Sequence, residues 1–234
     1  MSAKCENRIR TLLRTTSETL GAVTPTRFLK WASIAFIFGI GVLILTPYPH
    51  YVPPDFGFGF LRNKSQYFYR SGYFFGFYAH IFGAPLALFA GGLQVSRTLR
   101  ERSPGFHRRM GQVYVAAVLL FAAPGGLVMS SKAYGGWSST ICFALLAAVT
   151  WCSTFVGWRA ARAYEIERHV RWMTRSYVLI CSAVFLRLTH FSLQPLNLSN
   201  ELTYQLSAWI SWLVPVMILG LVWRISATPF RGIG

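Results

Sequence analysis

Long apolar runs alternate with short polar segments rich in Lys and Arg along most of the 234-residue chain. A helix that crosses a membrane needs about 20 mostly apolar residues to cover roughly 30 Å of hydrocarbon. Runs that approach or exceed this length are predicted at about residues 28–46, 71–96, 110–130, 137–158, 172–191 and 203–225. The pattern therefore predicts an all-α membrane protein, a bundle of six transmembrane helices.

Three polar or irregular segments complete the predicted organisation. A basic arm over residues 1–27 and a tail over 226–234 flank the six-span domain of residues 28–225. The arm lacks the cleavage motif of a signal peptide, so we expect it to lie along anionic lipid headgroups. The loop over residues 47–70 is dense in aromatic residues, prolines and glycines. This density favours an interfacial cap, with a lid over a substrate site as the less frequent alternative.

The composition points to the same class of protein. Charged residues make up 13% of the chain, well below the roughly 25% typical of soluble domains. The formal net charge is +16, but the basic residues are spread between the apolar runs. Nucleic-acid binding requires a clustered basic face, so this distribution argues against it. The expected partners are the lipid bilayer and its anionic headgroups; the sequence indicates no protein partner.

The distribution of basic residues also predicts an orientation. Of the 23 Lys and Arg residues, 18 lie in residues 1–30, in segments 97–109 and 159–175, or near the C-terminus. Only 4 lie in the alternate loops. Cytoplasmic loops carry an excess of Lys and Arg. We therefore expect both termini in the cytoplasm of a multi-pass protein of the cell inner membrane.

Arg187 falls within a predicted span, about four residues before its end, whereas all seven acidic residues fall outside the spans. Ionisable residues within a span are costly and often functional. The guanidinium could snorkel to the nearby interface as an anchor. Alternatively, it could face the bundle and hold an anion such as a cofactor carboxylate or a lipid headgroup.

Four histidines fall at two predicted depths. His107 and His169 begin the third and fifth spans, whereas His80 lies deep in the second span and His190 ends the fifth. If these helices pack as neighbours, His107 could face His169 and His80 could face His190. Imidazoles paired across a bundle can hold haem iron.

In that hypothesis His107 and His169 are the axial metal ligands. Arg109 and Arg171 would bind the haem propionates through charge-assisted hydrogen bonds. The alternative is that both histidines are solvated at a membrane surface among arginines. His80 could instead bond to a backbone carbonyl that Pro85 leaves free.

Three segments carry a resemblance to a known family: YAHIFGAPLALFAGGLQ (78–94), PGFHRRMGQVY (104–114), and HVRWMTRSYVL with FLRL (169–188). They resemble a bacterial family of predicted membrane proteins catalogued as domain of unknown function 2306. The resemblance implies an integral membrane protein without an established activity. A weaker likeness is to transmembrane two-haem b-type cytochromes, which pair histidines of the second and fourth helices and of the third and fifth. The fourth span here contains no histidine, so a second haem would need His190.

Three functions follow from these residues. The leading one is an integral membrane protein of unknown activity, and the specific hypothesis for it is a b-type haem electron-transfer module. An alternative is a small carrier or lipid-binding protein that uses Arg187 and the helices interrupted by Pro85 and by Pro124-Gly125-Gly126. The third is a structural or assembly subunit. The chain has no HExxH or GxSxG motif, and hydrolase chemistry is therefore not indicated.

Overall fold

The computed structural model describes residues 35–36, 38–62, 64–70 and 72–227. The chain divides into two units, Met1–Ile37 and Phe38–Gly234, and the account below concerns the second. The predicted basic arm, the tail from residue 228 and residues 28–34 and 37 of the predicted first span lie outside the described residues. Of that span, residues 35–36 and 38–45 are described and are helical.

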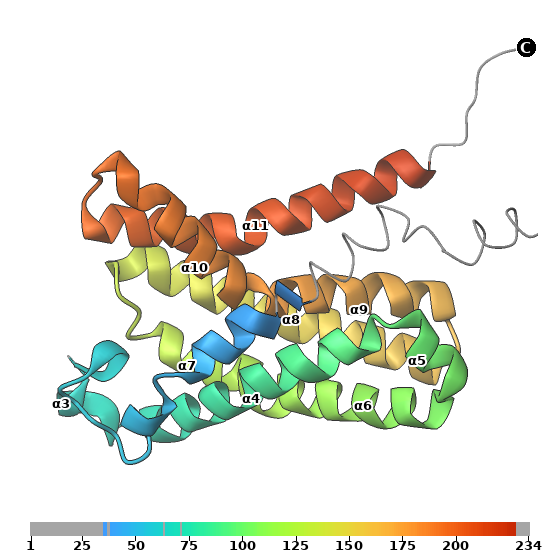
Figure 1. The fold of residues 1–234 in the computed structure, drawn as a ribbon, viewed down its shortest axis with the longest axis horizontal. Helices are drawn as coiled ribbons and strands as arrows, with labels where there is room; N and C mark the ends of the chain where they lie inside the picture. Colours follow the sequence, from blue (N-terminus) through green and yellow to red (C-terminus); the bar gives the residue numbers. More distant parts are fainter. Residues whose placement is uncertain (1–34, 37, 63, 71, 228–234) are drawn as a thin grey trace, which may run out of the picture. The chain divides into compact units, whose positions relative to one another are not determined.

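All regular secondary structure in the described residues is helical (Figure 1). The long helices are α4 (Tyr73–Gln94), α6 (Pro104–Ala116), α8 (Gly136–Arg162), α9 (Ile166–Ile180), α10 (Ser182–Leu193) and α11 (Asn200–Ala227). The short ones are η1 (Tyr48–His50), η2 (Gly59–Leu61), α3 (Ser65–Phe68), α5 (Arg97–Arg102), α7 (Ala123–Ser130) and η4 (Gln194–Leu196). A π-helix, η3 (Ala117–Ala122), joins α6 to α7.

Four helical stretches are long and apolar enough to cross a membrane: Tyr73–Gln94, Pro104–Ser130, Gly136–Arg162 and Asn200–Ile225. Helices α9 and α10 together would make a fifth span, bent by 44°. The all-α membrane architecture is therefore confirmed with four or five candidate spans, whereas the number six and the orientation of the termini stay predictions.

Two of the predicted spans differ from the helices observed. The third begins at Pro104 rather than near residue 110, because proline lacks an N–H and suits the first turn of a helix. The fifth, predicted over 172–191, is interrupted at Cys181 between α9 and α10. No proline or glycine marks this break.

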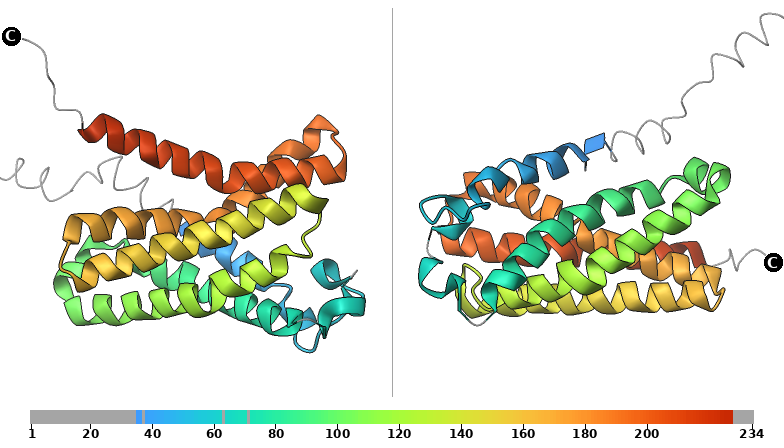
Figure 2. Two further views of the ribbon diagram at one scale, coloured as in Figure 1. Left: turned by 180° about the vertical axis from the view of Figure 1, so that it is seen from behind. Right: turned by 90° about the horizontal axis from the view of Figure 1, so that it is seen from below.

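The helices pack in two groups, which Figure 2 shows from two further sides. Helix α4 packs on α6, η3, α7 and α9, and α8 packs on α9 and α7. Helix α10 packs mainly on α11. Close approach depends on glycine at the α4–η3 contact, where a Cβ on Gly83 would lie 2.5 Å from the Cβ of Phe121.

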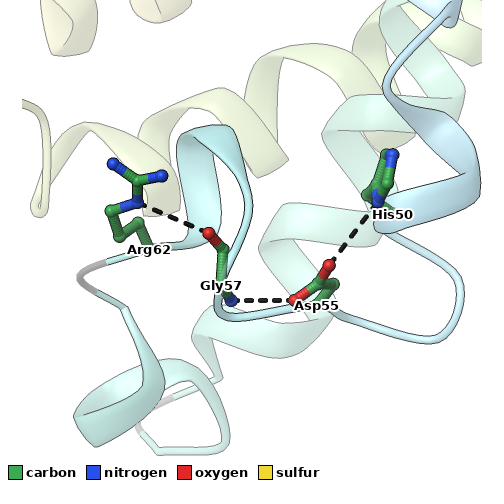
Figure 3. Close-up of polar contacts among 4 residues, drawn as sticks. All are labelled: His50, Asp55, Gly57 and Arg62. Carbon is green, nitrogen blue, oxygen red and sulfur yellow. Dashed lines mark hydrogen bonds and ion pairs between the residues drawn. The ribbon is translucent and has the colours of Figure 1, made fainter.

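The loop over residues 46–70 is ordered by its own polar contacts (Figure 3). Asp55 accepts a hydrogen bond from the backbone N–H of Gly57 (2.8 Å), and its other carboxylate oxygen lies 3.5 Å from Nδ1 of His50. Arg62 Nε donates to the carbonyl of Gly57 (3.4 Å). These contacts fold the loop so that its aromatic side chains pack against α4.

Lys64 fixes the same loop to the connection between α7 and α8. Its side chain is buried, and Nζ donates to the carbonyl of Lys132 (3.0 Å) and to the hydroxyl of Tyr67 (3.3 Å). Nζ also lies 4.4 Å from the centre of the Phe60 ring. Burial lowers the pKa of Lys64 below its ordinary value, because desolvation penalises the charged form.

Candidate functional site

A cavity of about 360 Å³ lies within the second unit. Its wall is formed by helical residues near Gly41, by the start of the aromatic loop, and by α4, η3, α7, α8, α9, α10 and α11. Most lining side chains are apolar. The polar ones are Tyr48, Tyr51, His80, Ser130, Thr150, Ser182, Arg187, Tyr204 and Ser211. The lining contains no carboxylate, which leaves the cavity with a positive electrostatic bias.

Arg187 lies in the second turn of α10 and lines this cavity. Its Nη1 donates to the carbonyl of Ala183 (2.8 Å), which uses only one of its five N–H groups. Among the described residues, no carboxylate lies within ion-pair distance of the guanidinium. Of the two interpretations drawn from the sequence, the structure favours a side chain that faces the interior of the bundle.

His80 reaches the cavity from α4. Its Nδ1 lies 2.7 Å from the carbonyl oxygen of Ala122, the last residue of the π-helix η3. The expected backbone partner is therefore present, but it comes from the neighbouring helix rather than from the turn before Pro85. Because a carbonyl only accepts, Nδ1 must carry the proton in this hydrogen bond.

The aromatic loop supplies one wall of the cavity through Tyr48, Tyr51 and Phe60. The hydroxyl of Tyr48 donates to the carbonyl of Ile81, and the hydroxyl of Tyr78 donates to the carbonyl of Tyr51 (2.6 Å). Burial raises the pKa of Tyr48 to about 12, with the nearby positive charge of Arg187 acting in the opposite direction. The Tyr48 phenol is therefore protonated at neutral pH. The loop is more than an interfacial cap, because it closes an internal space.

His107 lies near the start of α6 and His169 near the start of α9, at the other end of the bundle. Nδ1 of His169 lies 2.8 Å from the carbonyl of Gly157, whereas Nδ1 of His107 is buried without a hydrogen-bond partner among the described residues. Arg109 and Arg171 are both exposed.

About two helical turns further along α6 and α9, the interior of the bundle is filled by side chains. A Cβ on Gly91 would lie 2.6 Å from Cε2 of Tyr177 and 2.8 Å from Cε2 of Tyr114. The hydroxyl of Tyr114 lies 2.6 Å from Oγ of Ser176, which lies 2.6 Å from Oγ1 of Thr154. We call Gly91, Tyr114, Thr154, Ser176 and Tyr177 the closed layer. A haem in this layer would have to displace these side chains, and the haem hypothesis stays a prediction.

The other predicted pair is not brought together. His80 lines the cavity, whereas the ring of His190 packs on Phe191 outside the lining. Within the part of the chain that the structure describes, no polar contact joins His80 and His190, and α4 and α10 are not among the closely packed helix pairs. No group of three or more His, Cys, Asp or Glu side chains in these residues could hold a metal ion.

Two cavity residues had no signal in the sequence. Tyr204 reaches the cavity from α11 and Tyr51 from the loop, and neither hydroxyl makes a hydrogen bond among the described residues. Tyrosine is common near membrane interfaces, so position along the chain could not separate these two from the other tyrosines. Only the approach of the loop to α10 and α11 identifies them.

The family described as "Predicted membrane protein (DUF2306)" matches residues 77–223. The chain belongs to this family. The match covers α4 to α11, and therefore includes His80, Arg187 and Tyr204 but not the aromatic loop. No curated protein and no solved structure matches the chain. The family description agrees with the apolar helices and assigns no activity.

Proposed function

We propose that this membrane protein binds an amphiphilic small molecule or lipid in the cavity, with the polar end of the ligand at Arg187. The observation that carries the proposal is a guanidinium without a carboxylate partner that lines an apolar cavity of about 360 Å³. A buried cation costs free energy unless a counter-charge or strong acceptor compensates it. Among the described residues, one backbone carbonyl accepts a hydrogen bond from the guanidinium. Oxygen atoms of the ligand would accept from the remaining N–H groups.

The broken span supports a binding or carrier role over a purely structural one. Helix α10 begins at Ser182, and Ser182, Ala183 and Arg187 all line the cavity. In many transporters, interrupted helices direct the positive N-terminal end of a half-helix toward an anionic substrate group. Here the start of α10 and the guanidinium of the same helix lie at one cavity.

The test is to purify the wild type and Arg187→Leu in mild detergent and to identify bound molecules by native mass spectrometry. We expect the variant to lose about tenfold or more of the co-purified ligand, since a hydrogen bond to a charged group contributes about 1.5–3 kcal/mol. Arg187→Lys should retain part of it. Arg162→Leu, at the exposed end of α8, is the matched control. Equal ligand in the wild type and Arg187→Leu would contradict the proposal.

A further inference from the structure

The imidazole of His80 is held in one orientation and one tautomer. Its Nδ1–H donates to the carbonyl of Ala122, at the end of the π-helix and two residues before Pro124. Gly126 leaves room for the ring, because a Cβ there would lie 3.1 Å from Nδ1 and 3.2 Å from Cε1. With Nδ1 protonated, Nε2 of the neutral ring is an acceptor. Within the described residues, Nε2 has no hydrogen-bond partner.

The cavity therefore presents two kinds of polar group on two different helices. His80, on α4, offers a hydrogen-bond acceptor. Arg187, on α10, and Tyr204, on α11, offer donors without partners among the described residues. Helices α4 and α10 do not pack closely on each other, so the acceptor and the guanidinium lie on separate walls. A ligand that hydrogen-bonds to both sets of groups needs an O–H for His80 at one end of its head. At the other end it needs an oxygen that accepts from Arg187 or Tyr204.

The rest of the wall favours a flat ring between these two groups. Tyr48, Tyr51, Phe60, Phe77, Phe143 and Tyr204 all contribute aromatic side chains to the lining. Aromatic rings pack favourably on one another in offset or edge-to-face arrangements. A volume of about 360 Å³ is within the range of pockets that hold small molecules.

We propose that the head of the ligand is a hydroxylated aromatic ring of the quinol type. One hydroxyl donates to Nε2 of His80, and the oxygen across the ring accepts from Arg187 or Tyr204. This inference rests on the proposed function and adds the chemical class of the ligand. A fatty-acid carboxylate would satisfy Arg187 equally well, but it would leave the His80 acceptor without a donor.

The test uses two substitutions that separate the nitrogen atoms of His80. In His80→Asn the side-chain amide N–H can replace Nδ1 and keep the hydrogen bond to Ala122, but nothing replaces Nε2. In His80→Gln the longer side chain can place an accepting oxygen near the position of Nε2. Binding of a decyl-chain benzoquinol, kept reduced under anaerobic conditions, and of oleate is measured by calorimetry in detergent. The melting temperature of each variant reports on folding.

We expect His80→Asn to bind the benzoquinol about tenfold more weakly than the wild type, with a similar melting temperature. His80→Gln should lose less affinity, and both variants should bind oleate as the wild type does. Unchanged benzoquinol binding in His80→Asn would overturn the inference.

Binding of oleate without binding of the benzoquinol, with oleate affinity lost in Arg187→Leu, would also overturn the quinol inference but would leave the proposed function standing. If the wild type binds neither probe, the quinol inference fails, and the co-purification experiment on Arg187→Leu decides the proposed function separately.

Discussion

The closed layer and the cavity both place polar side chains inside the bundle, but only the closed layer supplies each of them with a partner from the chain. Tyr114, Ser176 and Thr154 form a continuous series of short hydrogen bonds that ends on the carbonyl of Thr150. In the cavity, Nε2 of His80 and most N–H groups of Arg187 have no such partner among the described residues.

The difference lies in what fills the space between the helices. In the closed layer, Tyr114 and Tyr177 occupy the space over Gly91. At the cavity, the side chains of the described residues leave a space of about 360 Å³, which residues of α4 and α10 both line. Buried polar groups in native proteins are normally hydrogen-bonded, so unpaired ones require an explanation. Polar side chains that hydrogen-bond to one another, as in the closed layer, contribute to stability. Polar side chains that line a cavity without such partners indicate a binding site for a ligand.

The largest effect should follow from filling the closed layer. Gly91→Ala introduces a methyl group within 2.6 Å of Tyr177 Cε2 and 2.8 Å of Tyr114 Cε2. We expect a loss of about 3 kcal/mol of stability or more, at the upper end of the usual cost of overpacking, because two rings meet the added methyl group. The melting temperature in detergent measures this loss. Gly220→Ala in α11 is the control, because nothing lies within 4 Å of the added Cβ. Equal melting temperatures for the two variants would show that the layer can relax.

A smaller loss should follow from removing one hydroxyl of the closed layer. Ser176→Ala takes away the group between Tyr114 and Thr154, and we expect a cost of about 1–3 kcal/mol because a buried hydroxyl loses its partner. Ser192→Ala, at an exposed position of α10, is the control. Arg187→Leu should destabilise the ligand-free protein less than Ser176→Ala does. A greater loss for Arg187→Leu would contradict the contrast between the two regions.

The smallest expected signal concerns haem. Because the closed layer fills the interior of the bundle about two helical turns from His107 and His169, we expect the protein purified after haem-replete expression to show no Soret absorption. His107→Ala and His169→Ala should then have the same visible spectrum as the wild type. A Soret band that either substitution abolishes would restore the haem hypothesis and show that the closed layer opens.

Hydropathy was sufficient to predict the helical membrane architecture, because apolar runs of this length have few other stable states. It could not predict the break at Cys181, since no proline or glycine marks it and the bend depends on how α10 packs on α11. The sequence pattern did not predict the π-helix either. The interruption expected at Pro124 lies two residues after its end.

The candidate site was predictable only in part. Arg187 and His80 stood out because ionisable residues are rare in apolar spans. Their environments depended on contacts between segments far apart in the sequence, such as His80 with Ala122. The positions of His107 and His169 near the starts of their helices were also expected from the sequence. What the sequence did not reveal is that the interior two helical turns further along is filled, which depends on tyrosines packed over a glycine.

The π-helix η3 also absorbs one residue of chain between two sets of contacts. A π turn holds one residue more than an α-helical turn, and each residue of an α-helix advances by about 100°. Deleting one residue from Ala117–Ala122 would therefore convert the wide turn into an ordinary α-helical turn and leave the faces of α6 and α7 close to their present phase. Tyr114 could stay against Ser176 and Gly125 against α4. A single deletion in this segment should be tolerated better than one in the regular part of α6, which would rotate the two ends by that angle relative to each other.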